Sequence, residues 1–204
     1  SNKNNILTDF FTTGTYDARR EFYKTNAPAM DILVSSNLER LVWFMVNGDS
    51  EKVNKYMEEL KETGVYKVDD ETLARVQKEF KAGCLGEEDV LKVIHDCWNE
   101  NKYLLDTHTA VGYGVYEEYV KNTGDTIKTI LLSTASPYKF PESVYQALTG
   151  EEVDVYTAIE KLHELTGMDI SYPLKGIKDR EILHKGVIDR DAILDTIADK
   201  IKEY

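Results

Sequence analysis

Hydroxyl side chains gather directly after one short apolar segment of the sequence. Ser133, Thr134 and Ser136 follow the run Ile-Lys-Thr-Ile-Leu-Leu that starts at Ile127. At the end of a buried strand, such hydroxyls can donate hydrogen bonds to a ligand. Serine and threonine are also ordinary turn residues that bond to their own backbone. On spacing alone, a ligand site and a simple turn are both open.

A second polar group, formed by Ser36, Asn37 and Arg40, suggests an anion site. Ser36 followed by Glu39 fits a capping box, which predicts a helix beginning at Ser36. Free amides in the first turn, together with the helix dipole, favour an anion such as phosphate beside Asn37 and Arg40. The alternative is that Arg40 is one more solvated charge on an amphipathic helix.

His108 stands in the sequence Asp-Thr-His-Thr-Ala, next to Thr109 and close to Asp106. The imidazole could serve as a general base or donate to a phosphate, whereas a lone histidine near a helix start is more often structural. The sequence has no glycine-rich phosphate loop and no Ser/His/Asp set at a recognisable spacing. We therefore predict no metal site, and from the residues alone only an anion pocket.

The elements that would position these residues are mostly short amphipathic helices. Apolar stripes at helical spacing, opened by capping residues or proline and often closed by glycine, predict helices that start near residues 36, 50, 106, 141, 154 and 189. Two further stripes, from Leu73 to Phe80 and from Val90 to Cys97, predict two more helices. Ala29 to Ser35 and Ile127 to Ser133 are short and apolar, so we predict two buried strands there, with a third candidate at residues 103–105. The predicted fold class is therefore α/β and rich in helix.

Composition narrows the possible functions. The 204 residues carry a formal net charge of -12, which disfavours nucleic-acid binding. Cys84 and Cys97 are too few for a disulfide framework and stand outside metal-ligand spacing, as is typical of a reducing cytosol. No apolar run approaches the length of a membrane span. We expect a cytoplasmic protein that binds neither nucleic acid nor membrane.

Four motifs, taken in order and spacing, resemble the carboxyl-terminal part of the threonine synthase family. They are Ser1-Asn2-Lys3-Asn4-Asn5-Ile6-Leu7-Thr8 with Gly14 and Tyr16, the run Ala27 to Arg40, Asp106-Thr107-His108-Thr109-Ala110-Val111-Gly112, and Leu132-Ser133-Thr134-Ala135-Ser136-Pro137-Tyr138-Lys139-Phe140. The resemblance continues weakly through the closing helices. It therefore covers essentially the whole chain.

The resemblance implies a fold and a cofactor. The fold would be the helix-rich part of a tryptophan-synthase-β-like pyridoxal-phosphate enzyme, with an open, mostly parallel sheet flanked by helices. Residues 1–140 would be the carboxyl-terminal part of the catalytic domain, with a helical insertion at about 49–100, and residues 141–204 a carboxyl-terminal helical segment. The family's Schiff-base lysine and cofactor-phosphate loop lie upstream of the position of Ser1, and neither Lys3 nor Lys139 matches that lysine.

The same resemblance implies site residues and a reaction. Thr134, with Ser133 beside it, would contact the pyridine nitrogen of pyridoxal phosphate. Ser36, Asn37 and Arg40 would contact the substrate near its phosphate, and His108 with Thr109 would belong to the same pocket. The parent enzyme would convert O-phosphohomoserine and water to threonine and phosphate.

We expect this chain to be inactive alone, because the Schiff-base lysine is missing. Two alternatives stay open: a related phospho-lyase that yields a 2-oxo acid, and a non-catalytic binding or assembly module. A homodimer formed through exposed apolar surface is a further expectation.

Overall fold

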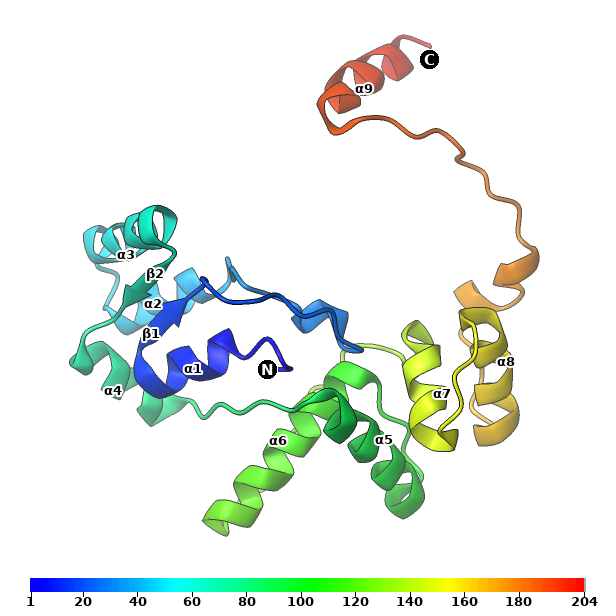
Figure 1. Ribbon diagram of the computed structural model, residues 1–204, viewed down its shortest axis with the longest axis horizontal. Coiled ribbons are helices and arrows are strands. Elements are labelled where there is room, and N and C mark those ends of the chain that lie inside the picture. Colours follow the sequence, from blue (N-terminus) through cyan, green and yellow to red (C-terminus); the bar gives the residue numbers. More distant parts are fainter. Residues whose placement is uncertain (204) are drawn as a thin grey trace. The chain divides into compact units, whose positions relative to one another are not determined.

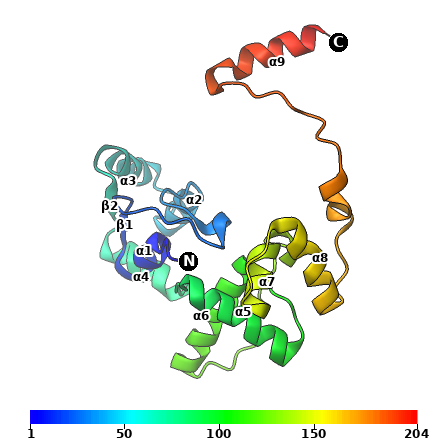
Figure 2. The same ribbon diagram turned by 45° about the vertical axis from the view of Figure 1, so that its right-hand side comes forward.

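The computed structural model describes residues 1–203, which form two compact units. The first comprises Ser1–Ile170 and the second begins at Ser171. Figures 1 and 2 show the helices and strands of each unit. All residues predicted for the site belong to the first unit. The division predicted at about residue 140 stays a prediction.

The amino-terminal part of the first unit packs four helices around a two-stranded sheet. Its elements are α1 (Ile6–Thr13), β1 (Thr15–Asp17), the 3-10 turn η1 (Pro28–Met30), α2 (Leu38–Met45), α3 (Ser50–Thr63), β2 (Val65–Lys67) and α4 (Asp70–Glu79). β1 and β2 are antiparallel, with Tyr16 opposite Tyr66. Each strand follows a helix that ends in a left-handed glycine, Gly14 after α1 and Gly64 after α3, so the two helix–strand pairs are built alike.

Aromatic rings form the centre of this part of the unit. Tyr66 stacks on Tyr16 on one side and on Tyr56 of α3 on the other, each at a centroid distance of 5.4 Å. Phe10 of α1 meets the edge of Tyr16 at 6.1 Å. All four rings are buried, and Val42 of α2 packs in the same cluster. The stack therefore joins α1, α2 and α3 to both strands.

The rest of the first unit is helical. α5 (Glu87–Asn101) packs against α6 (Thr107–Thr123) and α7 (Pro141–Thr149), and α7 packs against α8 (Val155–Thr166). A second 3-10 turn, η2 (Pro137–Lys139), leads into α7. Figure 2 shows α7 beside α5 and α8. This stack of helices positions the first turn of α6, which carries the Asp-Thr-His-Thr sequence.

The second unit contains the 3-10 turns η3 (Tyr172–Leu174), η4 (Ile177–Asp179) and η5 (Arg190–Ala192), followed by α9 (Ile193–Lys202). Ile193, Ile197 and Ile201 repeat every four residues along α9, so they share one face. All three are exposed in the structure.

The helix predictions rested on local signals and most are confirmed. α3, α6, α7 and α8 occupy the predicted positions. α3, α6 and α8 begin after aspartates whose carboxylates accept backbone amides. The prediction for α2 is wrong at its start, because α2 begins at Leu38 and Ser36 lies in the turn before it. Asn37, and not Ser36, occupies the N-cap position, with helical backbone angles and no side-chain bond to an amide. The capping box predicted for Ser36 and Glu39 therefore does not form.

The fold class, a helix-rich α/β part, is confirmed, but the predicted strands are wrong. Residues 29–35 are irregular after the turn at Pro28–Met30, and residues 127–133 and 103–105 contain no strand. The sheet that the structure describes within residues 1–203 is the antiparallel pair β1–β2, not a parallel one. An apolar run becomes a strand only where another strand pairs with it. Here the backbone around Leu33 bonds to a side chain, and Ile130 and Leu132 are exposed.

Candidate functional site

His108, Thr109 and Ser133 come together at the start of α6. Asp106 caps this helix: its Oδ1 accepts from the backbone amides of His108 at 2.9 Å and Thr109 at 3.3 Å, and its Oδ2 accepts from the Thr109 hydroxyl. The Thr109 hydroxyl also lies 3.3 Å from Oγ of Ser133. Asp106 is 1% exposed and Thr109 is 4% exposed. The cluster is therefore a desolvated polar network that holds Ser133 near α6.

Both ring nitrogens of His108 have partners in this network. Nε2 accepts from the backbone amide of Ala29 at 2.9 Å, so the proton of a neutral imidazole resides on Nδ1. Nδ1 lies 3.3 Å from Asp106 Oδ1. The ring also packs on Phe140, at a centroid distance of 4.5 Å. In this arrangement His108 ties the turn at Pro28–Met30 to the start of α6.

Asn37 and Arg40 form a second pair at the start of α2. Nη2 of Arg40 donates to Oδ1 of Asn37 at 2.6 Å, which fixes the guanidinium beside the helix terminus. Ser36, Asn37 and Arg40 are all exposed. A cation held by a neutral amide and open to solvent keeps donors free for an incoming anion. The pair therefore has the free hydrogen-bond donors and the positive charge that an anion site requires.

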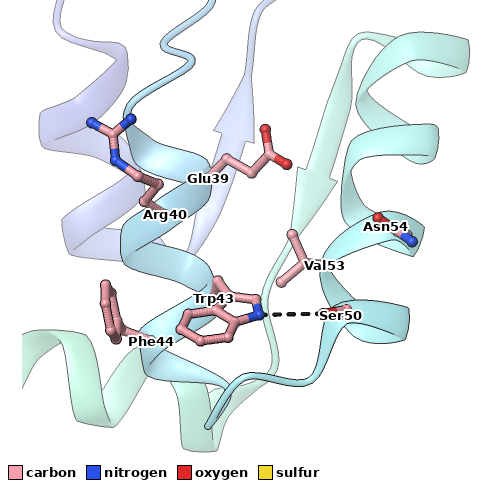
Figure 3. A pocket seen from close by; sticks show the side chains of 7 residues that line it. All are labelled: Glu39, Arg40, Trp43, Phe44, Ser50, Val53 and Asn54. Atoms are coloured by element: carbon pink, nitrogen blue, oxygen red, sulfur yellow. Dashed lines mark hydrogen bonds between the residues drawn. The ribbon is translucent and has the colours of Figure 1, made fainter.

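A pocket of about 350 Å³ lies between α2 and α3, with Arg40 on its wall (Figure 3). Trp43 closes one side, and its indole Nε1 donates to the Ser50 hydroxyl of α3 at 3.3 Å. Phe44 lies beside Trp43, with the two rings edge to face at 5.1 Å. Ser50, Val53 and Asn54 come from α3, so α3 completes this pocket.

The structure leaves Thr134 exposed, directly after Ser133. Among the residues that the structure describes, no hydrogen bond links the cluster at α6 to the pair at α2. Whether both groups face one ligand stays a prediction.

Sequence reasoning missed two residues that hold these groups in place. Asp106 is the hub of the cluster at α6, and Tyr16 bonds to the backbone directly before Ser36. A signal for Asp106 was available, because Asp-x-x-Thr also starts α4 at Asp69 and α8 at Asp154, each aspartate accepting the amide of the threonine. No local signal identifies the contact of Tyr16.

No helix within residues 1–203 is long and apolar enough to cross a membrane. Within the same residues, no group of three or more His, Cys, Asp or Glu side chains is placed to hold a metal ion.

Comparison with known proteins connects this geometry to a family. The family model described as "Threonine synthase, C-terminal" matches residues 109–170. Threonine synthase of Saccharomyces cerevisiae is 37% identical over 164 residues, which are 74% of this chain and 32% of that protein. Threonine synthase-like 1 of Homo sapiens is 34% identical over 176 residues, which are 80% of this chain and 23% of that protein. The chain thus spans about a third or less of these relatives.

Solved structures show the same likeness in the fold. The crystal structure of threonine synthase from yeast covers 100% of this chain and 41% of its own, with a TM-score of 0.82 and 30% identity. The structure of PLP-bound threonine synthase from Brucella melitensis covers 88% of this chain and 38% of its own, with a TM-score of 0.68 and 30% identity.

Proposed function

The chain is related in sequence and in fold to the carboxyl-terminal part of threonine synthases, and we propose that it serves as that part of a pyridoxal-phosphate-dependent phospho-lyase. The proposed reaction converts O-phosphohomoserine and water to threonine and phosphate. The observation that carries the proposal is the likeness to the yeast enzyme over 100% of this chain, at a TM-score of 0.82. The activity belongs to the proposal because this chain spans only 41% of that structure.

Thr134 and Ser133 are the proposed contacts of the cofactor ring. Both are exposed hydroxyls and so are accessible, and the Thr109 hydroxyl holds Ser133 near α6. Pyridoxal phosphate supplies an electron sink for carbanions when bound. A hydroxyl at the ring nitrogen donates or accepts a hydrogen bond but adds no negative charge, unlike an aspartate. We therefore propose that Thr134 orients the ring without enforcing its protonation.

Arg40 and Asn37, with Ser36 before them, are the proposed contacts of the substrate phosphate. The guanidinium supplies a permanent positive charge in a chain of net charge -12, and Asn37 orients it. The prediction that His108 and Thr109 contact the substrate stays a prediction. Their bonds to Ala29, Asp106 and Ser133 support a role in holding the walls of the site.

One alternative reaction has an observation in its favour. From the similarity to threonine synthase-like 1 of Homo sapiens we propose, as the alternative, a related phospho-lyase. It would release phosphate, ammonia and a 2-oxo acid, with water hydrolysing the imine product instead of adding at Cβ. Both reactions begin with the same phosphorylated substrate class, so the proposed role of Arg40 is common to them. A cytoplasmic location and a homodimer through exposed apolar residues such as Ile130 and Leu132 stay predictions.

The proposed anion site is tested by titrating the chain with O-phosphohomoserine and with inorganic phosphate, followed by NMR of the arginine side chains. We expect the Arg40 Nε resonance to move. We also expect Arg40→Gln to weaken binding about tenfold or more, because a hydrogen bond to a charged group contributes about 1.5–3 kcal/mol. Arg180→Gln, which changes an exposed arginine of the second unit, is the matched control. Binding that survives Arg40→Gln unchanged would overturn the assignment.

A turnover assay tests the expected inactivity of the isolated chain. We expect neither phosphate nor threonine to be released when the chain is incubated with pyridoxal phosphate and O-phosphohomoserine. Turnover by the isolated chain would show that a lysine within residues 1–204 serves the cofactor.

A further inference from the structure

The hydroxyl of Tyr16 bonds twice to the backbone that leads into the proposed anion site. It donates to the carbonyl of Leu33 at 3.0 Å and accepts from the amide of Ser35 at 2.7 Å. Ser36 and Asn37 follow at once along the chain. Tyr16 is 0% exposed, and this burial raises the pKa of its hydroxyl, so the group stays neutral and can make both bonds at physiological pH.

The ring of Tyr16 belongs to a stack of three rings that reaches α3. It stacks on Tyr66 with an interplanar angle of 13°, and Tyr66 stacks on Tyr56 of α3 at 25°. Tyr56 in turn donates to Oδ2 of Asp69, the aspartate that caps α4. The stack bonds to Asp69 through the Tyr56 hydroxyl and to residues 33–35 through the Tyr16 hydroxyl. It therefore connects α3 and α4 to residues 33–35.

Residues 33–35 need such a support because they lack a strand partner. Buried or half-buried peptide groups require a partner, and a neighbouring strand normally supplies it. Here one side chain satisfies a carbonyl and an amide two residues apart, which fixes the direction in which the chain enters α2. The position of Asn37 and Arg40 depends on that direction.

We propose that Tyr16 is the positioning residue of the anion site at the start of α2, and that the Tyr16–Tyr66–Tyr56 stack is the mount through which the helical insertion holds it. This inference rests on the proposed function in assigning the anion to Arg40. The mount holds residues 33–35 through the bonds of Tyr16 to the carbonyl of Leu33 and the amide of Ser35, whether or not an anion binds. It assigns the insertion a role in orienting the site as well as in lining the pocket beside Arg40.

The test compares Tyr16→Phe with Tyr138→Phe, which removes a buried hydroxyl that donates to the carbonyl of Met168, outside the stack and away from residues 33–35. Amide hydrogen exchange is measured by NMR for residues 33–40, and the affinity for inorganic phosphate is measured by titration. We expect Tyr16→Phe to speed exchange at Ser35 about fivefold and to weaken phosphate binding about fivefold, because the lost hydrogen bond to the Ser35 amide is worth about 1 kcal/mol. Tyr138→Phe should change neither quantity.

The possible results test the mount and the anion site separately. Unchanged exchange at Ser35 in Tyr16→Phe overturns the mount. Faster exchange combined with unchanged phosphate affinity overturns the positioning role. An unmodified chain that binds no phosphate refutes the anion site of the proposed function, while exchange at Ser35 still decides the mount. If Tyr16→Phe does not fold, exchange in the unmodified chain decides: slow exchange at Ser35 supports the mount, and exchange at the rate of a free peptide overturns it.

Discussion

Replacing Asp106 by alanine tests how far burial raises the cost of losing a helix cap. Asp106 and Asp154 share three capping contacts: each accepts two backbone amides and the hydroxyl of the threonine three residues later. Asp106 also lies 3.3 Å from Nδ1 of His108. The two aspartates differ in environment, because Asp106 is 1% exposed whereas Asp154 is exposed. Asp154→Ala is therefore a control with the same capping chemistry.

The expected magnitude follows from what each substitution leaves behind. Losing an N-cap aspartate costs about 1 kcal/mol, which we expect for Asp154→Ala. At Asp106 the Thr109 hydroxyl and the amides lose their acceptor in a site that water does not reach freely, and a stranded buried group adds about 1–3 kcal/mol. We therefore expect Asp106→Ala to lower the free energy of unfolding by about 3 kcal/mol.

Urea unfolding followed by far-ultraviolet circular dichroism measures the difference. With an m-value of about 2 kcal/mol/M, the midpoint should fall by about 1.5 M for Asp106→Ala and by about 0.5 M for Asp154→Ala. Asp106→Asn keeps one acceptor oxygen, so its midpoint should lie between those of the unmodified chain and Asp106→Ala. Equal losses for the two alanine variants would refute the reasoning from burial.

Two further predictions concern the Lys52–Asp69 ion pair and α6. The ammonium of Lys52, 2.5 Å from Asp69, holds the pKa of Asp69 well below its usual range. Because the pKa of Asp69 is lower in the folded chain than in the unfolded chain, this stabilisation is present above about pH 4 and is lost as the pH falls. The difference in urea midpoint between the unmodified chain and Asp69→Asn should therefore shrink between about pH 6 and pH 2. A constant difference would contradict the ion pair. A Cβ added at Gly114 would lie 2.5 Å from Leu85, so Gly114→Ala should lower the unfolding free energy by about 1–3 kcal/mol. Gly112→Ala, whose nearest contact would be 3.5 Å away, should raise it by up to about 1 kcal/mol, and equal effects at the two glycines would contradict the packing of α6.

The helices could be predicted from the sequence because their signals are local. Val53, Tyr56 and Leu60 define the inner face of α3 within one segment, and Gly64 marks its end. The same holds for α6 and α8, where an aspartate and a glycine bracket the helix. Each of these signals spans at most about twenty residues, so no knowledge of the tertiary fold is needed to interpret it.

The candidate site was only partly predictable because its key bonds join distant residues. His108 and Ala29 are 79 residues apart, and Thr109 and Ser133 are 24 apart. Residue types mark such positions as capable of chemistry, but nothing in a single sequence says which amide meets which imidazole. The sequence therefore predicted His108 as a candidate and left its structural role open as an alternative. Its partners in the structure favour that role.

The two wrong strand predictions differ in an informative way. In both segments the apolar residues were recognised correctly, but the partner of the backbone was not. At residues 33–35 the partner is the hydroxyl of Tyr16, so an apolar run was folded into an irregular support for the turn before α2. At residues 127–132 the apolar side chains Ile130 and Leu132 are 86% and 77% exposed, so the residues that the structure describes do not bury these two side chains. The first error reflects a side chain taking the place of a strand. The second reflects a hydrophobic preference that the described residues leave unmet, in the segment that ends at the proposed cofactor contacts Ser133 and Thr134.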